Sequence, residues 1–451
     1  MDMMRQLLLN FTVAIFVFRG RHAVAQSLVF SSTNNVSQNP VSLVAADVNG
    51  DGKMDLVSGQ YGYQTLTVLT NNGNGTFSPC STNGPSGGAF EYSVVAGDFN
   101  QDGKVDLVSL HEASPKNLTL LTNDGTGIFS AAKTLNTAFP PTSICGADVN
   151  GDGYPDLIVA HGYFAAVSIF TNDGAGNLVL SATNSVGTGP NCMVAVDVNG
   201  DKKADLITAN QGVYPTYVGS ITVLTNTGSG IFVANATYAM PYSLSSIVAA
   251  DVNGDGYPDL IAASRSGVTS QGVLIVLTNN GSGNFSSNAV YLVGQGTSSL
   301  AAADMNGDGK VDLICANAGD NNVMVLTNDG RGNFTIACTN CAGPSPGALV
   351  VADVNGDGKP DVISANSGPN NTLTVLLNSP LPPSLAFQVA PTNTLNFSWS
   401  AAWPGFELQQ NSDLATTNWI NVSGSTGTVA GVNQLVLPPP AGNNFYRLVH
   451  P

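Results

Sequence analysis

Seven nine-residue segments of the chain carry side-chain oxygen atoms at the same positions. Aspartate stands at positions 1, 5 and 9 and asparagine at position 3, as in Asp47-Val-Asn-Gly-Asp-Gly-Lys-Met-Asp55. These side chains, together with the backbone carbonyl of position 7, could converge on one hard cation. Ca²⁺ accepts about six to eight oxygen ligands, whereas Mg²⁺ needs a stricter octahedral arrangement, and the segments offer no His or Cys to zinc or copper. We therefore predict that each segment is a calcium-binding loop.

The predicted calcium ligands lie at positions 1, 3, 5, 7 and 9 of the seven loops. They are Asp47, Asn49, Asp51, Lys53, Asp55, Asp98, Asn100, Asp102, Lys104, Asp106, Asp148, Asn150, Asp152, Tyr154, Asp156, Asp197, Asn199, Asp201, Lys203, Asp205, Asp251, Asn253, Asp255, Tyr257, Asp259, Asp304, Asn306, Asp308, Lys310, Asp312, Asp353, Asn355, Asp357, Lys359 and Asp361. A single segment of this kind could also be an ordinary Asn-Gly or Asp-Gly turn. Seven in one register favour calcium, with about seven ions in all.

Two loops depart from the pattern. Gln101 replaces glycine at position 4 of the second loop, a change that we expect to be harmless. Lys202 replaces glycine at position 6 of the fourth loop. Because a non-glycine residue with positive φ costs about 1 kcal/mol, we predict that the fourth loop is the weakest calcium site.

The net charge of −16 follows largely from these loops. They hold 21 of the 30 acidic residues, and seven Ca²⁺ ions would bring the net charge to about −2. The chain has only 14 Lys and Arg residues and no basic patch, which argues against nucleic-acid binding.

The loops recur with a period typical of a repeated supersecondary unit. Successive first aspartates are 51, 50, 49, 54, 53 and 49 residues apart. In each unit one apolar run precedes the loop and a second follows it, and then comes a third, such as Leu66-Thr-Val-Leu69. A glycine-rich hairpin and a more polar fourth run complete the unit in most cases. Four short strands per unit are typical of a propeller blade, so we predict an all-β, seven-bladed β-propeller.

The two ends of the array indicate how the propeller closes. Residues 28–33 resemble the fourth strand of a unit, and the last unit stops after its third strand, Leu373–Leu377. We therefore predict that the N-terminal strand completes the last blade and covers its edge. The propeller is expected to span residues 26–379, followed by a proline-rich linker at 380–383. A small β-sandwich-like domain is expected at 384–451, which holds all three tryptophans.

These repeats resemble the FG-GAP/VCBS repeat family, whose best-known members are the integrin alpha-subunit propellers. The resemblance covers about residues 28–378, although Ala-Ala or Ala-Gly pairs stand where the family name gives Phe-Gly. It implies a seven-bladed propeller, a calcium loop in most blades, and a role in adhesion or carbohydrate binding. Some members of the family carry the propeller attached to an enzyme.

The face opposite the calcium loops is where we predict ligand binding. In an up-and-down blade the loop and the hairpin after the third strand share one face, so the remaining connections form the other. Loops on a rigid scaffold carry recognition, and exposed aromatic side chains suit sugars and protein partners. The candidate ligand contacts are Tyr61, Tyr63, His111, Tyr163, Tyr214, Tyr217 and Arg265. We expect a carbohydrate or an extracellular protein as the ligand, and a monomeric propeller.

A polysaccharide-acting enzyme, either a lyase or a hydrolase, is the alternative function. It would use His111, Glu112 and His161 as acid and base on the same face. The sequence contains no serine elbow, phosphate loop or cofactor fingerprint, so a binding function is favoured.

Residues 1–25 have the features of a secretory signal peptide. Arg5 precedes the apolar run at 7–18, and Ala23-Val24-Ala25 provides a small-residue cleavage site. An uncleaved membrane anchor is the alternative, but about 12 apolar residues are too few to span a bilayer. We therefore expect a secreted or cell-surface protein with no membrane span in the mature chain.

The six cysteines are few for this length. In an exported protein Cys338 and Cys341 are expected to form a local disulfide. Cys145, Cys192 and Cys315 fall in apolar strands and are expected to be buried thiols.

Overall fold

The chain divides into two compact units, Gln26–Ser379 and a C-terminal unit within Pro380–Pro451. The structure is a computed structural model that describes residues 26–36, 39–61, 65–83, 91–111, 117–137, 139–213, 217–265, 271–380, 385–389, 394–400, 407–412, 418–422, 427–429, 432–438 and 444–449. The predicted signal peptide at 1–25 and most of the predicted linker at 380–383 lie outside these residues.

The described part of the first unit consists of seven four-stranded sheets, which we number as blades in the order of the predicted calcium loops. From the inner to the outer strand, the first three blades are β2 (Pro40–Ala46), β3 (Asp55–Gln60), β4 (Leu66–Asn71) and β5 (Phe77–Asn83); β6 (Glu91–Gly97), β7 (Asp106–His111), β8 (Asn117–Asn123) and β9 (Phe129–Asn136); and β10 (Ser143–Ala147), β11 (Asp156–His161), β12 (Ala166–Asn172) and β13 (Leu178–Ser185). A 3-10 turn, η1 (Gly162–Phe164), joins β11 to β12.

The remaining four blades follow the same order from the inner to the outer strand. They are β14 (Pro190–Val196), β15 (Asp205–Asn210), β16 (Ser220–Asn226) and β17 (Phe232–Ala239); β18 (Leu244–Ala250), β19 (Asp259–Ser264), β20 (Gln271–Asn279) and β21 (Phe285–Gln295); β22 (Thr297–Ala303), β23 (Asp312–Asn317), β24 (Asn322–Asn328) and β25 (Phe334–Cys341); and β26 (Pro346–Ala352), β27 (Asp361–Asn366), β28 (Thr372–Pro380) and β1 (Gln26–Asn35).

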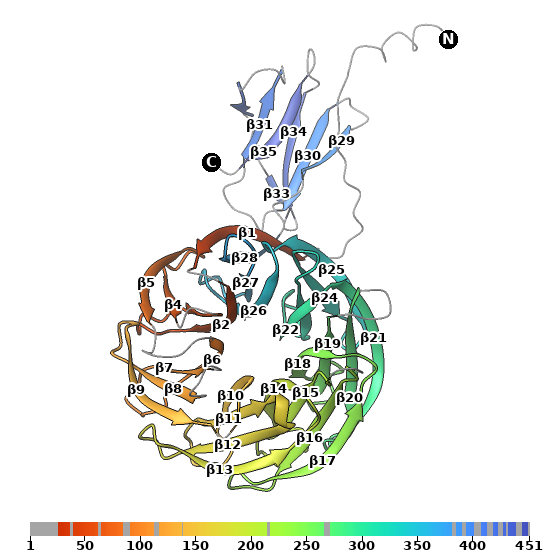
Figure 1. The fold of residues 1–451 in the computed structure, drawn as a ribbon. Coiled ribbons are helices and arrows are strands. Elements are labelled where there is room, and N and C mark those ends of the chain that lie inside the picture. Colours follow the sequence, from red (N-terminus) through yellow and green to blue (C-terminus); the bar gives the residue numbers. More distant parts are fainter. Residues whose placement is uncertain are drawn as a thin grey trace. The chain divides into compact units, whose positions relative to one another are not determined.

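These sheets stand around a common axis as the blades of a propeller (Figure 1). Each inner strand contacts the inner strand of the next blade, and β26 of the last blade contacts β2 of the first. The ring of sheets is therefore closed, and the prediction of an all-β propeller is confirmed.

The apolar core of the propeller lies between the blades. A second strand such as β3 is buried along its whole length because a neighbouring blade covers each of its faces. Since successive side chains of a strand point to opposite faces, Leu56 packs against the seventh blade and Val57 against the second. Seven apolar clusters of this kind fill the seven junctions between blades. Continuous apolar runs in the second strands are the sequence signal of this two-sided burial.

The N-terminal strand β1 completes the seventh blade, as the sequence predicts. It lies beside β28, at the outer edge of the sheet. Leu28 and Val36 are buried, with exposed fractions of 3% and 7%. The backbone N–H of Val36 donates to the carbonyl of Asn371 at 3.0 Å, and the Asn340 side chain donates to the carbonyl of Leu28 at 2.6 Å. The two ends of the propeller are thus joined by backbone pairing and by apolar contacts.

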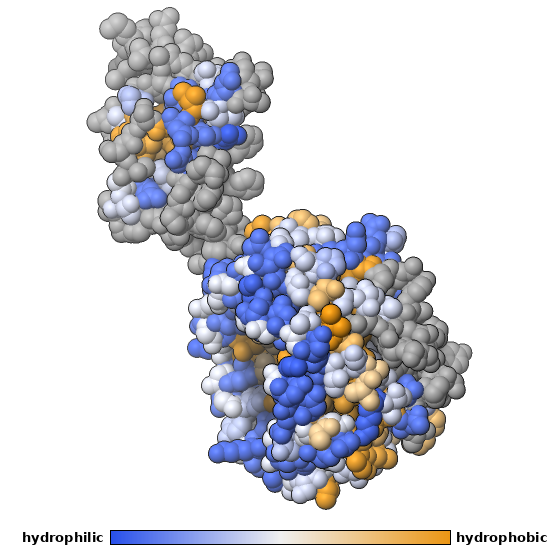
Figure 2. All heavy atoms as spheres, turned by 90° about the vertical axis from the view of Figure 1, so that its left-hand side faces the viewer, coloured by the Kyte–Doolittle hydropathy of each residue, from blue (hydrophilic) through white to orange (hydrophobic). Residues whose placement is uncertain are grey.

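The outer strands form the rim of the ring and have one face in solvent. In β9 and β13 buried or half-buried residues alternate with exposed ones over the second half of the strand. The side of the propeller that faces the viewer in Figure 2 accordingly mixes hydrophilic residues with scattered hydrophobic ones.

The C-terminal unit contains two small sheets. One pairs β29 (Ala386–Val389), β30 (Leu395–Ser400), β34 (Val432–Leu437) and β33 (Gly427–Val429), and the other pairs β32 (Ile420–Asn421), β31 (Glu407–Asn411) and β35 (Phe445–Val449). Trp399 and Phe397 are buried in its core with Leu395, Leu408 and Leu435. No helix within the described residues is long and apolar enough to span a membrane.

The expected disulfide between Cys338 and Cys341 is wrong. Both residues lie in β25 and all six cysteines are free thiols. Three residues of extended strand separate the two Cα atoms by about 10 Å, well beyond the roughly 4.4–6.8 Å that a disulfide spans. Cys315 is buried, as expected, whereas Cys145 and Cys192 are half-buried on inner strands.

Closure by β1 predicts that removal of residues 26–38 destabilises the propeller. The deletion uncovers the edge of β28 and removes Leu28 and Val36 from the junctions on either side of the seventh blade. Burial of each such side chain contributes about 1.5–3 kcal/mol, so we expect a melting temperature lower by about 5 °C or more. Thermal unfolding followed by differential scanning calorimetry measures this.

The control is Phe30→Ser, in which an exposed side chain of the same strand is replaced. This variant should melt like the parent protein. A deletion variant that melts at the parent temperature would show that the N-terminal strand does not hold the ring closed.

Candidate functional site

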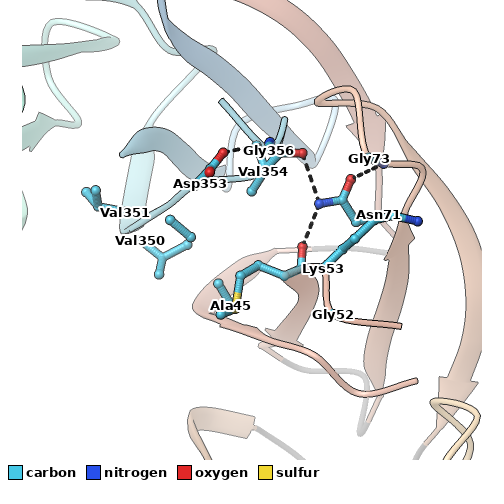
Figure 3. Close-up of a pocket in the computed structure, with 12 residues that line it drawn as sticks. Ala45, Gly52, Lys53, Asn71, Gly73, Val350, Val351, Asp353, Val354 and Gly356 are labelled. Carbon is cyan, nitrogen blue, oxygen red and sulfur yellow. Dashed lines mark hydrogen bonds between the residues drawn. The ribbon is translucent and has the colours of Figure 1, made fainter. Parts of the chain in front are cut away.

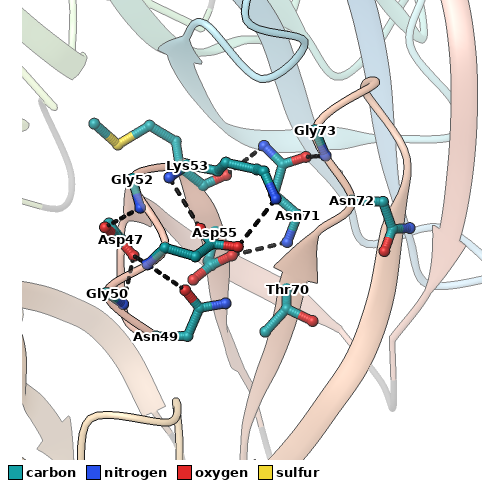
Figure 4. A network of polar contacts seen from close by, with 12 residues as sticks. Asp47, Asn49, Gly50, Gly52, Lys53, Asp55, Thr70, Asn71, Asn72 and Gly73 are labelled. Atoms are coloured by element: carbon teal, nitrogen blue, oxygen red, sulfur yellow. Dashed lines mark hydrogen bonds and ion pairs between the residues drawn. The ribbon is translucent and has the colours of Figure 1, made fainter.

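In the predicted calcium loops the backbone winds around the side-chain oxygens of the loop's own acidic residues, as Figure 4 shows for the first loop. In the first loop, Asp47 accepts the N–H of Gly50 at 2.7 Å and the N–H of Gly52 at 2.8 Å. The side-chain oxygen of Asn49 accepts the N–H of Asp51 at 2.9 Å. The first and third positions therefore set the loop conformation as well as offering oxygen atoms.

The bond from the N–H of position 6 to the first aspartate recurs in all seven loops at 2.7–3.0 Å. It requires a left-handed backbone, and φ at position 6 lies between 65° and 89°. Lys202 adopts φ 65° there, as the sequence predicts. Gln101, at position 4 of the second loop, also has a left-handed φ of 60°. The expectation that Gln101 is harmless is therefore wrong, because it carries the same backbone cost as Lys202.

The ninth-position aspartates lie inside the protein. All seven, namely Asp55, Asp106, Asp156, Asp205, Asp259, Asp312 and Asp361, are fully buried. In the first loop, Asp55 accepts the N–H of Val48 at 3.1 Å with one oxygen and the N–H of Asn71 at 2.8 Å with the other. Burial, together with the neighbouring aspartates of the same loop, raises the pKa of these carboxyl groups, and raises that of Asp361 to about 6.

A buried asparagine at or near the end of each third strand connects neighbouring blades. Asn71 donates its side-chain N–H groups to the carbonyl of Met54 in its own blade and to the carbonyl of Val354 in the seventh blade, both at 3.0 Å. Figure 3 shows this side chain beside a pocket of about 530 Å³ between the first and seventh blades.

The same bridge is present at every junction of the ring. Asn71, Asn123, Asn172, Asn226, Asn279, Asn328 and Asn378 donate to the carbonyls of Val354, Val48, Phe99, Val149, Val198, Val252 and Met305, respectively, at 2.6–3.0 Å. Each acceptor is position 2 of the preceding calcium loop. A chain of hydrogen bonds therefore runs from loop to loop around the whole propeller. The sequence signal was a recurring asparagine after the third apolar run, whose role we did not predict.

The loops offer oxygen donors that suit a hard cation. The aspartates of positions 1 and 5 and the asparagine of position 3 carry side-chain oxygen atoms at or near the surface. One oxygen of Asp47 already accepts two backbone N–H groups, those of Gly50 and Asp51, whereas its other oxygen accepts the N–H of Gly52. In the second loop, one oxygen of Asp106 is buried and has no hydrogen-bond partner. The residues present fit Ca²⁺ in the chemistry of their donors.

The arrangement of these donors is not yet that of a closed cage. Within the described residues, no three His, Cys, Asp or Glu side chains converge on one point. In four loops the lysine at position 7 pairs with the fifth-position aspartate, as Lys53 does with Asp51 at 3.1 Å. Tyr154 and Tyr257 stand at this position in the third and fifth loops, which therefore lack this internal cation.

Three of the predicted ligand contacts meet at one pocket on the opposite face. Tyr163, Tyr217 and Arg265 line a pocket of about 730 Å³. They come from the connections between the second and third strands of the third, fourth and fifth blades. The remaining lining residues are Pro141, Thr142, Gly162, Gly189, Gln211, Gly212 and Val213. Sequence analysis did not identify Gln211 or the three glycines as parts of this site.

The other predicted contacts do not join them in the described structure. Tyr61 is exposed in the first blade and does not line the pocket. Tyr63, Tyr214 and Glu112 lie outside the described residues, as does the side chain of His111.

The alternative role of His161 as a catalytic base is not supported. Its side chain is fully buried, its Nε2 atom lies 2.8 Å from the hydroxyl of Ser168, and burial lowers its pKa. His161 is the last residue of a second strand, a position that carries a polar residue in every blade. Those residues are Gln60, His111, His161, Asn210, Ser264, Asn317 and Asn366. His111 and His161 therefore occupy the polar position that recurs at the end of the second strand in every blade. The side chain of His161 is buried and is not accessible to a substrate.

The family of the chain follows from the match of its repeats to a known profile. The profile of the FG-GAP-like repeat matches residues 47–109, 102–159, 148–208, 197–262, 263–315 and 304–364. The chain belongs to the FG-GAP-like repeat family. A comparison with curated proteins gave no match.

The fold of this FG-GAP-like protein is also that of solved structures. Two crystal structures of BBS1N in complex with ARL6DN, soaked with lead or with mercury, match it with a TM-score of 0.56 at 12% and 11% identity. Each match covers 79% of this chain and 98% of the other. A functionally unknown protein from Desulfotomaculum acetoxidans matches with a TM-score of 0.49 at 15% identity, over 68% of this chain and 90% of the other. At these identities the likeness concerns the fold alone.

The asparagine bridges predict a large loss of stability for Asn226→Ala. The substitution removes the side-chain hydrogen bonds of Asn226 to the carbonyls of Val149 and Ala204 and to the N–H of Gly228. The carbonyl of Val149 then keeps only the N–H of Gly230. Each hydrogen bond contributes about 0.5–1.5 kcal/mol, so the loss of three should lower the free energy of unfolding by about 2 kcal/mol or more. Urea unfolding at saturating calcium measures it. Asn370→Ala, at an exposed asparagine of a connecting loop, is the control and should unfold like the parent. Equal stability of the two variants would contradict a bridging role.

Proposed function

We propose that this FG-GAP-like propeller is a calcium-stabilised binding module for a carbohydrate or an extracellular protein. The ligand binds on the face opposite the calcium loops. The observation that carries the proposal is the pocket in which Tyr163, Tyr217 and Arg265 meet. A pocket with two exposed aromatic rings and one cation on a rigid scaffold is typical of a ligand-binding site.

The walls of the pocket are held together before any ligand arrives. The N–H of Gly189 donates to the carbonyl of Gly162 at 3.2 Å, and the N–H of Gln211 donates to the carbonyl of Gly189 at 2.9 Å. These bonds tie connections of the third and fourth blades to each other. A preorganised site loses little conformational freedom on binding, which favours affinity.

The side chains of the pocket favour binding over catalysis. Among its described lining residues, the titratable side chains are those of Arg265, Tyr163 and Tyr217, with no carboxylate or imidazole to serve as acid and base. The BBS1N propeller, crystallised in complex with ARL6DN, is an example of the same fold with a protein partner. We infer a binding role for this chain as well.

In the proposed role calcium is structural. Each ion would be held by the side-chain oxygens of positions 1, 3, 5 and 9 and by the carbonyl of position 7, such as Asp47, Asn49, Asp51, Lys53 and Asp55. The ion would supply positive charge where several aspartates of one loop lie together. We also propose export of the mature chain, on the strength of the signal-like segment 1–25.

Chelation is expected to destabilise the protein. Ligands that bind only the folded state stabilise it by mass action, by about 2.7 kcal/mol per site at a hundred times Kd. Excess EDTA should therefore lower the melting temperature by about 10 °C or more, and Ca²⁺, but not Mg²⁺ at the same concentration, should restore it. Calorimetric titration of the metal-free protein should give about seven ions. A melt that EDTA leaves unchanged would contradict the structural role of calcium.

Ligand binding is expected to depend on Tyr163. The purified propeller is applied to an array of glycans and of extracellular matrix proteins at saturating calcium. Loss of an aromatic anchor at an interface costs about 2 kcal/mol or more, so Tyr163→Ala should weaken binding to any ligand found by about tenfold or more. Tyr61→Ala, on the same face but outside the pocket lining, is the control. Binding that survives Tyr163→Ala but is lost with Tyr61→Ala would place the site elsewhere.

A further inference from the structure

We propose that the pocket takes an acidic saccharide, with Arg265 bound to a sugar carboxylate and the two tyrosines beside the sugar rings. This inference rests on the proposed binding function and specifies the ligand class. It is carried by the charge of the pocket, the exposure of its rings and its size.

Arg265 gives the pocket a positive charge that no acidic residue of its described lining offsets. The pocket lining contains no Asp or Glu, and Arg265 forms no ion pair within the described residues. The neighbouring segments 214–216 and 266–270 contain no acid either. Asp320 of the sixth blade is not among the lining residues, and one of its carboxylate oxygens accepts the N–H of Gln295 at 2.8 Å. A guanidinium is suited to hold a carboxylate through two parallel hydrogen bonds.

The two tyrosines present flat surfaces to solvent. Tyr163 is 78% exposed and Tyr217 is 51% exposed. Tyr217 adopts a left-handed backbone with φ 45°, which is unfavourable for a bulky residue, and its N–H donates to the carbonyl of Val213 at 3.0 Å. Such conformations persist where the surroundings enforce them and are common at ligand sites. The backbone of Tyr217 is therefore constrained at the point where this residue lines the pocket.

The size of the pocket favours an oligosaccharide over a protein. Its volume of about 730 Å³ lies within the range of small-ligand sites, roughly 300–1,000 Å³. A stable protein interface instead covers about 800 Å² on each partner. The exposed side-chain amide of Gln211 can bond to sugar hydroxyls. One cation in a pocket of this size suits the charge of one acidic sugar.

The test compares acidic oligosaccharides with their own methyl esters, which keep the sugar rings and remove the charge. Trimers of galacturonate, guluronate and mannuronate are titrated calorimetrically into the full mature chain at constant free calcium. At least one acid is expected to bind about tenfold or more tightly than its ester. Arg265→Gln should remove this preference, and Arg265→Lys should restore part of it.

Arg331→Gln is the matched control, since it removes an equally exposed arginine from the hairpin on the calcium-loop face. It should bind like the parent, and all variants should melt at the parent temperature. If acids and esters bind equally, or if Arg265→Gln binds like the parent, the acidic ligand is wrong. In that case, if Tyr163→Ala still abolishes saccharide binding, the proposed binding function is retained. If no saccharide binds, acidic or neutral, the inference falls, and binding of matrix proteins through Tyr163 decides the proposed function separately.

Discussion

The buried asparagine at each blade junction is the contact on which the rest of the propeller depends. Asn279, for example, donates a side-chain N–H to the carbonyl of Val198 in the neighbouring blade. Its backbone N–H donates to the carboxylate of Asp259 in its own blade. A side-chain amide can donate two hydrogen bonds at once, which neither a serine nor a carboxylate can do. Apolar packing between sheets is tolerant of small shifts, whereas these bonds are directional. The bridges therefore fix the register of one blade against the next around the ring.

This bonding explains why each blade buries a carboxylate next to an exposed acidic loop. The ninth-position aspartate accepts the N–H of the bridging asparagine and, in six of the seven loops, the N–H of position 2. Burial of the charge raises its pKa, and the first and fifth aspartates raise it further. The fold thus concentrates negative charge at the points where the blades are joined. The proposed calcium ions would offset that charge at the same points, which links metal binding to the stability of the ring.

The sequence predicted the parts of the structure that are set by the repeat. Continuous apolar runs identified the second strands, because burial on both faces removes the usual alternation, and the missing fourth strand of the last unit identified the role of β1. The pocket could not be predicted as a unit, since Tyr163, Tyr217 and Arg265 are brought together only by the twist and packing of three blades. The error over His161 arose because sequence alone does not distinguish a loop residue from the last buried residue of a strand. The error over Cys338 and Cys341 has the same origin, since their spacing suits a turn but they lie in an extended strand.

The two faces of the propeller differ because different structural constraints act on them. On the calcium-loop face, every blade must meet its neighbours through the same bridge, so the residues there repeat from blade to blade. A face built only of such repeats would offer the same surface at every junction and could not form one distinct pocket. On the opposite face, the connections depart from one another: η1 ends with Ala165 in a left-handed conformation at φ 48°, and residues 211–219 form a longer connection in the next blade. Selectivity for one ligand therefore has to come from these irregular connections, and the repeating face supplies the rigidity that holds them in place.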